Sequence, residues 1–199
     1  MSIVNISDVT VLNNSTSFTE PYRFKITFEC MAPLQDDLEW KLTYVGSAES
    51  ESYDQELDTC MAAAPLPHRI PSSDLIGVTV ILLTCSYNDQ EFVRIGYYVN
   101  TEYGDPDLKL QHEASLAEDA DEKGIKAPDP TQHIDKLVRN VLADKPRVTK
   151  FNIQWDTPAV SAVPTMSSAT TGAIGSEAMA GAPAAAAPPP PFNPYQAAA

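Results

Sequence analysis

The sequence predicts an all-β fold: an immunoglobulin-like β-sandwich with one short helix, followed by a disordered C-terminal tail. Runs of alternating apolar and polar residues recur through the first part of the 199-residue chain, and turn-forming residues separate them. From Pro158 onward the chain consists mainly of Ala, Pro, Ser and Thr, with too few large apolar side chains to stabilise an ordered structure. We therefore expect a core domain over residues 1–156 and a disordered tail over residues 157–199.

Three strands are expected in the first part of the chain. Residues 22–29 and 38–44 alternate regularly between apolar and polar side chains, as strands with one buried face do. Residues 3–12 alternate less regularly, and a turn-prone sequence beginning at Asn13 follows them. Short antiparallel strands of this kind are typical of sandwiches.

The segment 77–103 predicts two adjacent strands joined by a hairpin turn over residues 87–90. Successive strand residues point to opposite faces of a sheet. The first strand therefore presents Val78, Val80 and Leu82 on one face and Ile81, Leu83 and Cys85 on the other. Both faces are apolar, so the face that is turned away from the core must be covered by a helix, a second layer or a partner.

The helix is expected over residues 131–144, because apolar residues fall there at helical spacing. These residues are Ile134, Leu137, Val138, Val141 and Leu142. The acidic segment 104–130 predicts a long loop with a helical turn around residues 114–122. The apolar residues of 151–155 predict a final strand.

The formal net charge is −14, from 27 acidic and 13 basic residues. Beyond residue 156 the only charged side chain is Glu177, so the predicted core domain is itself acidic. An acidic surface repels nucleic acid phosphates and attracts basic partners, which argues against direct DNA binding. No stretch is long and apolar enough to suggest a membrane span, so we expect no membrane association.

The cysteines allow two readings. Cys30, Trp40 and Cys85 are spaced like the Cys, Trp and Cys of an immunoglobulin domain, which would suit a secreted adhesion module. Against this, Leu83 occupies the position of the corner tyrosine, and no signal sequence opens the chain. The other reading is two free core thiols in a reducing, intracellular compartment.

No catalytic site is expected from the sequence. His68, His112 and His133 lie in loop-like sequence, and none has metal-ligand spacing from a Cys or another His. Phosphate-binding glycine loops and nucleophile motifs are absent from the sequence. We therefore expect a non-enzymatic protein with no cofactor.

Several unusual strings follow one another over residues 1–156. They are Val11–Asn14, Phe24–Cys30, Asp37–Glu56, Val78–Tyr87, Glu91–Tyr103, Arg139–Ala143 and Lys145–Trp155. These strings resemble the anti-silencing function family of histone chaperones. The resemblance implies an immunoglobulin-like sandwich that binds a dimer of histones three and four and escorts it during nucleosome assembly and disassembly. It also implies a nuclear protein, and transfer without an ATP site.

The resemblance further implies a histone-binding surface on the outward face of segment 77–103. In the family this face receives the C-terminal helices of histone three on an apolar centre with charged positions beside it. The implied contacts are Val45, Asp54, Val78, Val80, Leu82, Arg94 and Tyr98, with Val78, Val80 and Leu82 at the apolar centre and Asp54 and Arg94 as the charged positions.

A second implied contact lies near the end of the core domain. In the family the tail of histone four adds as a strand beside the segment that matches residues 147–149. Arg147 and Thr149 are the candidates, with Leu142 and Pro146 in apolar contact.

A rival interpretation is an immunoglobulin-like interaction module for another basic protein.

The sequence departs from the family between Leu57 and Ile70. Family members carry a longer segment there, with a glycine-proline turn and a further phenylalanine-rich strand, so we expect one sandwich edge to be missing or replaced. The same edge in the family binds a basic peptide of assembly co-chaperones. The matching residues are Asp36, Asp37, Leu38 and Lys41.

We expect the free protein to be a monomer.

Overall fold

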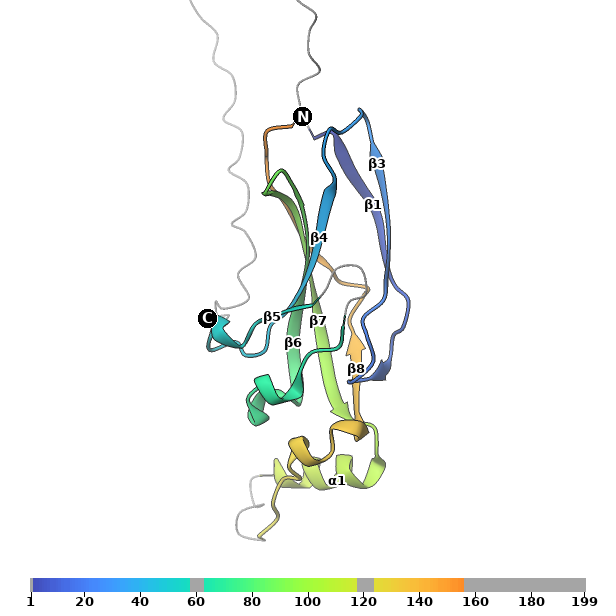
Figure 1. Ribbon diagram of the computed structural model, residues 1–199. Coiled ribbons are helices and arrows are strands. Elements are labelled where there is room, and N and C mark those ends of the chain that lie inside the picture. The colour runs from blue at the N-terminus through green and yellow to red at the C-terminus, as the bar shows by residue number, and fades with distance from the viewer. Residues whose placement is uncertain (1, 58–62, 118–123, 156–199) are drawn as a thin grey trace, which may run out of the picture.

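Two β-sheets pack face to face (Figure 1). The structure, a computed structural model, describes residues 2–57, 63–117 and 124–155. The smaller sheet pairs β1 (Val4–Val11) with β3 (Phe24–Cys30). The predicted all-β, immunoglobulin-like sandwich is confirmed, whereas the predicted tail lies outside the described residues.

The larger sheet has seven strands in the order β2-β8-β7-β6-β4-β5, with β9 also paired to β7. Their bounds are β2 Thr16–Ser17, β4 Leu38–Tyr44, β5 Gln55–Leu57, β6 Gly77–Tyr87, β7 Gln90–Tyr103, β8 Leu137–Val141 and β9 Arg147–Lys150. All of these pairings are antiparallel. The long β6–β7 hairpin lies at the centre of the sheet, so it supports both the core and the outer surface.

The turn of this hairpin has the predicted position. Asn88 and Asp89 lie between Tyr87 and Gln90, and their φ angles are 50° and 58°. Two successive positive φ angles are the mark of the tight turn that suits the twist of a hairpin, and Asn and Asp tolerate them best among residues with a side chain. The local sequence therefore fixes the pairs Tyr87↔Gln90 and Ser86↔Glu91 next to the turn.

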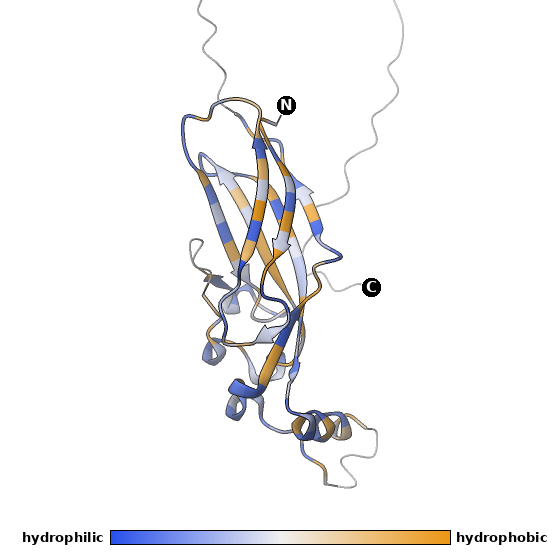
Figure 2. Ribbon diagram, turned by 90° about the vertical axis from the view of Figure 1, so that its right-hand side faces the viewer, coloured by the Kyte–Doolittle hydropathy of each residue, from blue (hydrophilic) through white to orange (hydrophobic). Residues whose placement is uncertain are grey.

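The hairpin divides its side chains between two apolar environments. From β6, Ile81, Leu83 and Cys85 are buried in the core between the sheets, and β7 adds Ile95 and Tyr97. The alternation left open which face is the core, and the family resemblance implied this one. The alternation of apolar and polar residues is visible along the strands in Figure 2.

The helix predicted over residues 131–144 is wrong. Two short 3-10 turns are followed by β8, which pairs with β7 from Tyr103↔Leu137 to Val99↔Val141. Leu137, Arg139 and Val141 are buried at every second position, as in a strand. The inward-facing arginine hides this alternation in the sequence, and pairing along the edge of β7 outweighs the helical spacing.

The only α-helix among the described residues is α1 (Pro106–Ser115), at the opposite end of the molecule from the hairpin turn (Figure 1). Asp105 caps it by accepting a hydrogen bond from the backbone N–H of Asp107. The helix thus begins the acidic segment that we expected to be a loop. The 3-10 helices are η1 Glu51–Tyr53, η2 Pro67–Arg69, η3 Ser72–Asp74, η4 Pro130–Gln132 and η5 Ile134–Lys136.

The final strand also differs from the prediction. Residues 151–155 have no regular structure, and the strand is β9, just before them. The Trp155 ring stacks on Tyr87 at 5.4 Å between centroids and meets Phe92 edge to face at 5.0 Å. The apolar residues of this segment therefore close the end of the core by packing, without a strand ladder.

Cys30 and Cys85 are both free, so the disulfide of the adhesion-module reading is absent. Cys85 is fully buried, and this burial raises the pKa of its thiol to about 12. Cys30 is exposed, which corrects the expectation of two core thiols. Cys30 is the last residue of β3, and no neighbouring segment among the described residues buries its side chain.

Arg139 is a buried cation in the middle of β8, with 1% of its surface exposed. Its guanidinium donates hydrogen bonds to the backbone carbonyls of Phe18, Glu20 and Pro21, and it lies over the Tyr22 ring at 3.6 Å from the centroid. One side chain thus fastens the whole 18–22 loop to the large sheet.

Gln55 holds the segment that connects β5 to β6, which the family resemblance predicts to be shortened. Its buried side chain donates a hydrogen bond to the carbonyl of Leu66 at 3.1 Å and accepts one from the N–H of Leu66 at 2.7 Å. A strand neighbour would make the same pair of bonds. The amide therefore replaces part of a strand, and residues 63–69 contain no β-strand.

Replacing Gln55 with alanine is expected to lower the free energy of unfolding by about 2 to 4 kcal/mol, because both backbone groups of Leu66 lose their partner. Urea denaturation of the full chain measures this value. Gln111→Ala is the matched control, since Gln111 is exposed and makes one long hydrogen bond of 3.5 Å to the Lys126 carbonyl. An equal, small effect of both substitutions would show that Gln55 has no special role.

Candidate protein-binding surface

A second apolar cluster lies on the outer face of the large sheet, separate from the core. It contains Val45, Val80 and Leu82, with the partly buried Tyr98 packed against them. Val78 lies beside it with 67% of its surface exposed. We call these five residues the outer patch. Large apolar side chains that gather outside the core mark a surface that a partner covers.

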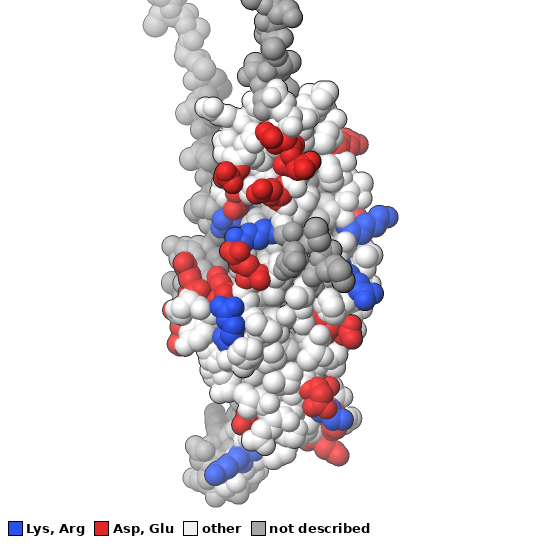
Figure 3. Space-filling view, in the orientation of Figure 1, with Lys and Arg blue, Asp and Glu red and all other residues white. Residues whose placement is uncertain are grey.

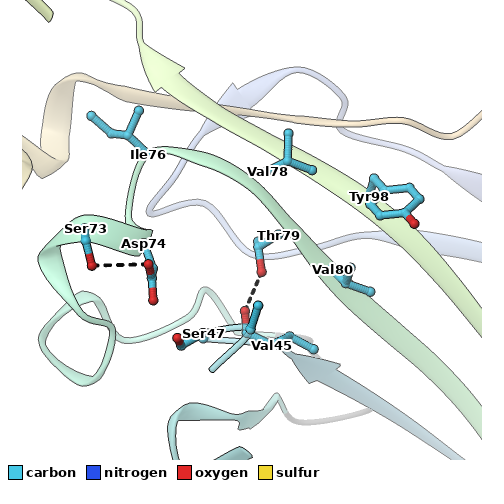
Figure 4. Close-up of a pocket in the computed structure, with 11 residues that line it drawn as sticks. Val45, Ser47, Ser73, Asp74, Ile76, Val78, Thr79, Val80 and Tyr98 are labelled. Carbon is cyan, nitrogen blue, oxygen red and sulfur yellow. Dashed lines mark hydrogen bonds between the residues drawn. The ribbon is translucent and has the colours of Figure 1, made fainter. Parts of the chain in front are cut away.

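Strand register assembles the outer patch. Val80 of β6 is opposite Tyr98 of β7, and the N–H of Val45 donates to the carbonyl of Val80 at 2.9 Å, just beyond the end of β4. The Thr79 hydroxyl donates to the carbonyl of Val45 (Figure 4). These bonds fix three neighbouring segments, so the patch is formed before a partner arrives.

The loop after Val45 closes tightly around the patch. A Cβ atom on Gly46 would lie 2.2 Å from the backbone oxygen of Tyr53, so only glycine fits there. Beyond it, Val45, Val78, Val80 and Tyr98 line a hollow of about 250 Å³. Ser47 and Asp74 lie on one side of this hollow, as Figure 4 shows. The hollow combines an apolar wall with polar groups at its margin.

Asp54 lies next to the patch. It is half-buried between η1 and β5, and it directly precedes Gln55, which pairs with Tyr44 at the end of β4. Continuing this antiparallel register by one residue places Asp54 opposite Val45. The sequence-predicted carboxylate stands at the margin of the apolar surface.

Arg94 lies further along β7, opposite Thr84, and is ion-paired with Glu91. Its Nε and one terminal nitrogen donate to the two carboxylate oxygens at 2.7 and 3.0 Å. In a regular strand, residues three apart face opposite sides, but a β-bulge that includes Phe92 brings Glu91 and Arg94 together. The hydrogen bonds to Glu91 raise the pKa of Arg94, although partial burial opposes this shift.

The family resemblance implied Arg94 as a charged position, and Glu91 was not expected. The paired carboxylate fixes the guanidinium in one orientation and leaves part of it exposed. The local sequence does carry a signal for the bulge, because the adjacent apolar residues Phe92 and Val93 break the alternation and are both buried.

The residues proposed for the second contact are divided between two places. Arg147 and Thr149 are opposite Gly96 and Arg94, so they face the same side as the outer patch. Leu142 is half-exposed, and its N–H donates to the Tyr98 carbonyl at 2.8 Å.

Pro146 instead lines a different hollow, of about 310 Å³, together with Ile6, Val9 and Val148. That hollow lies where the β1 edge of the small sheet meets β7 and β9. Pro146 is therefore grouped with this hollow and not with the residues that line the hollow of the outer patch.

Of the residues implied for the co-chaperone contact, Asp36, Asp37 and Leu38 lie at the other end of β4, and Lys41 lies at the middle of the strand. Leu38 pairs with Tyr87 near the hairpin turn, and the N–H of Asp36 donates to the Tyr87 hydroxyl at 3.3 Å. Asp37 is exposed beside them, and Lys41 is ion-paired with Glu56. Figure 3 shows acidic side chains gathered over this end of the molecule, basic and further acidic side chains below them, and an area without charged side chains further down.

Neither a metal centre nor a membrane span is present in the described part of the chain. No group of three or more His, Cys, Asp or Glu side chains there could hold a metal ion. Within residues 2–57, 63–117 and 124–155, no helix has the length and apolarity to cross a membrane.

The fold and the surface define a class of protein: an immunoglobulin-like sandwich that presents an apolar patch flanked by charged side chains on its outer sheet face. The chain matches the family described as ASF1 like histone chaperone over residues 1–67 and 59–156. It belongs to this family of histone chaperones. The two matched segments overlap at the shortened β5–β6 connection, where a deletion relative to the family would divide the match.

Similar proteins include "Histone chaperone ASF1" of Candida albicans, at 51% identity, and "Histone chaperone cia1" of Schizosaccharomyces pombe, at 52% identity. These alignments cover 78% and 79% of this chain but only 62% of each relative. The chain therefore spans less than two thirds of their length. "Histone chaperone ASF1" of Mycosarcoma maydis is 51% identical, with 83% of this chain and 94% of the relative covered.

Proposed function

We propose that the chain binds a dimer of histones three and four through the outer patch and escorts it during nucleosome assembly and disassembly in the nucleus, without catalysis. The observation that carries this proposal is the apolar cluster of Val45, Val80, Leu82 and Tyr98 outside the core. The relatives' names support a histone as the partner.

The outer patch suits an amphipathic helix. Its central side chains come from three adjacent segments of the sheet and form a continuous apolar area. A helix that packs here would bury its own apolar stripe on Val80 and Leu82, which then dominate the affinity. Asp54 and Arg94 would fix its orientation and, with the acidic net charge of −14, accelerate encounter with a basic partner.

The tail of histone four is proposed to add as a strand beside β9. Among the described residues β9 pairs only with β7, so its second edge is open to an extended peptide. Arg147 and Thr149 would contact the tail on the outer face, and Leu142 would contribute an apolar contact. Pro146 would contact it from the other side of this edge.

The protein would act by covering a histone surface until deposition. A covered surface cannot make histone-histone contacts, so the dimer stays soluble, and its transfer depends on competition between affinities. A basic peptide of an assembly co-chaperone is proposed to bind at Asp36, Asp37, Leu38 and Lys41. Asp36, Asp37 and Leu38 lie at or just before the end of β4 that is far from Val45, and Lys41 lies at the middle of the strand.

Val78→Arg is expected to reduce affinity for purified histone three–four dimers at least about tenfold, because it places a charge on the apolar surface that the helix would cover. Val78 is mostly exposed, so the substitution costs the fold little. Isothermal titration at physiological salt measures the change. Leu110→Arg, on the exposed face of α1, is the matched control and should bind like the unmodified chain.

A basic protein without histone structure, such as lysozyme, separates this proposal from the rival module for another basic protein. Lysozyme should show no saturable binding to the unmodified chain at physiological salt, since charge alone is screened. Equal binding of lysozyme and histones, unaffected by Val78→Arg, would contradict the proposal.

A further inference from the structure

Within the described residues, the small sheet ends at a strand edge that pairs with no other strand. In the described part of the chain β3 pairs only with β1. The N–H of Met31 donates to the Ile3 carbonyl, and the Arg23 carbonyl accepts from Leu12, so the odd-numbered residues of β3 bond toward β1. The backbone groups of Phe24, Ile26, Phe28 and Cys30 therefore point to the open edge.

The same edge exposes apolar side chains that belong to the core side of the sheet. Phe24 lies 6.1 Å from the Tyr97 ring and Phe28 lies 6.3 Å from the Trp40 ring, between centroids, so both face the large sheet. Yet Phe28 is 41% exposed. An uncovered edge of this kind is a template for pairing with another strand.

We propose that the occupant of this edge is a second copy of the chain, with the two β3 strands antiparallel about a twofold axis at Thr27. Thr27 is the midpoint of Phe24–Cys30, so this register pairs every residue of the strand. Ile26 of one copy then lies opposite Phe28 of the other, and both have their backbone groups on the open edge. A shift by one residue would place these groups opposite residues that already bond to β1.

Charge complementarity selects the same register. On the outer face of β3, Lys25 of one copy lies opposite Glu29 of the other, and the symmetry makes this pair twice. Both side chains are exposed, and their direct partners on β1 are the uncharged Thr10 and Asn5, while the β1 carboxylate Asp8 is opposite Thr27. A shift by two residues shortens the ladder and separates Lys25 from Glu29.

The dimer would not use the histone surface. Lys25 and Glu29 face away from the large sheet, whose outer face carries the outer patch. The inference is therefore independent of the proposed function, and it replaces the monomer expected from the sequence. The β3 strand of the second copy would also cover Phe28. It would take the place that a third strand would have in the small sheet.

Sedimentation equilibrium of the full chain in reducing buffer, from about 1 to 200 µM, tests the proposal. A concentration-dependent dimer is expected. Lys25→Glu and Glu29→Lys should each weaken it about tenfold or more, because each turns two attractive pairs into repulsive ones. The double exchange of both residues should restore it to within about threefold. A chain that stays monomeric at 200 µM, or a double exchange that fails to restore the dimer, would overturn the proposal.

A crosslink tests the register directly. Thr27→Cys, in a chain with Cys30→Ser and Cys60→Ser, should form an intermolecular disulfide on oxidation, because directly opposed residues that are not hydrogen-bonded lie about 4.5 Å apart between Cα atoms. In the same background, Lys25→Cys should not crosslink, since its two copies are about 13 Å apart. Equal crosslinking by the two variants would contradict the register.

Discussion

Val80→Arg is expected to weaken binding of the histone three–four dimer by about a hundredfold or more. Val80 is the centre of the outer patch and is only 9% exposed, since it packs against Val45, Leu82 and Tyr98. A docked helix would remove the remaining water, so an arginine there would either bury an unpaired charge or push the helix away. Each of these costs several kcal/mol.

Fluorescence anisotropy with a labelled histone dimer measures this loss, and circular dichroism with a thermal melt checks that the variant remains folded. Val80→Ile is the matched control, because it keeps an apolar side chain at the same place. It should bind within about threefold of the unmodified chain. If the folded arginine variant binds as tightly as the isoleucine variant, the outer patch is not the histone site.

Arg139→Leu is expected to lower the free energy of unfolding by about 3 to 5 kcal/mol. The guanidinium is fully buried and bonds three carbonyls of the 18–22 loop while it lies on the Tyr22 ring. Burial lowers the pKa of Arg139, with Tyr22 and Glu20 opposing, but an arginine side chain stays charged at neutral pH. Leucine would leave the carbonyls without a donor and release the loop.

Denaturation in guanidinium chloride of the unmodified chain and of Arg139→Leu measures the difference. Arg147→Leu serves as the control for loss of an arginine at an exposed position and should change the value by less than about 0.5 kcal/mol. A similar small effect at both positions would mean that the hydrogen bonds of Arg139 contribute little.

Alternation along β6 and the turn at Asn88 predicted the central hairpin, because both signals are local and period two is unmistakable over a strand of this length. The same rule failed at β8. There Leu137 and Val141 are four apart, which fits a helix as well as a strand, and the inward residue between them is Arg139. The partner that decides between the two forms is β7, distant in sequence.

For the candidate site, strand alternation predicted that Val78, Val80 and Leu82 share one face, but it did not predict the groups that support them. Glu91 reaches Arg94 through a bulge, and Gln55 holds Leu66 by a side-chain pair that imitates a strand. These contacts depend on three-dimensional approach rather than on spacing or composition. Sequence patterns report which residues face together, and they say little about side chains that satisfy distant backbone groups.

Because β6 has apolar side chains on two faces, its residues evolve under two different constraints. Neighbouring codons of this strand are exposed to different selective pressures: changes at Ile81 or Leu83 act through the amount of folded protein, and changes at Val80 or Leu82 act through the surface it presents. A cell could compensate for the first kind with more expression or chaperone assistance. It could compensate for the second only with a matching change in the partner, so the even-numbered positions should evolve in step with another gene.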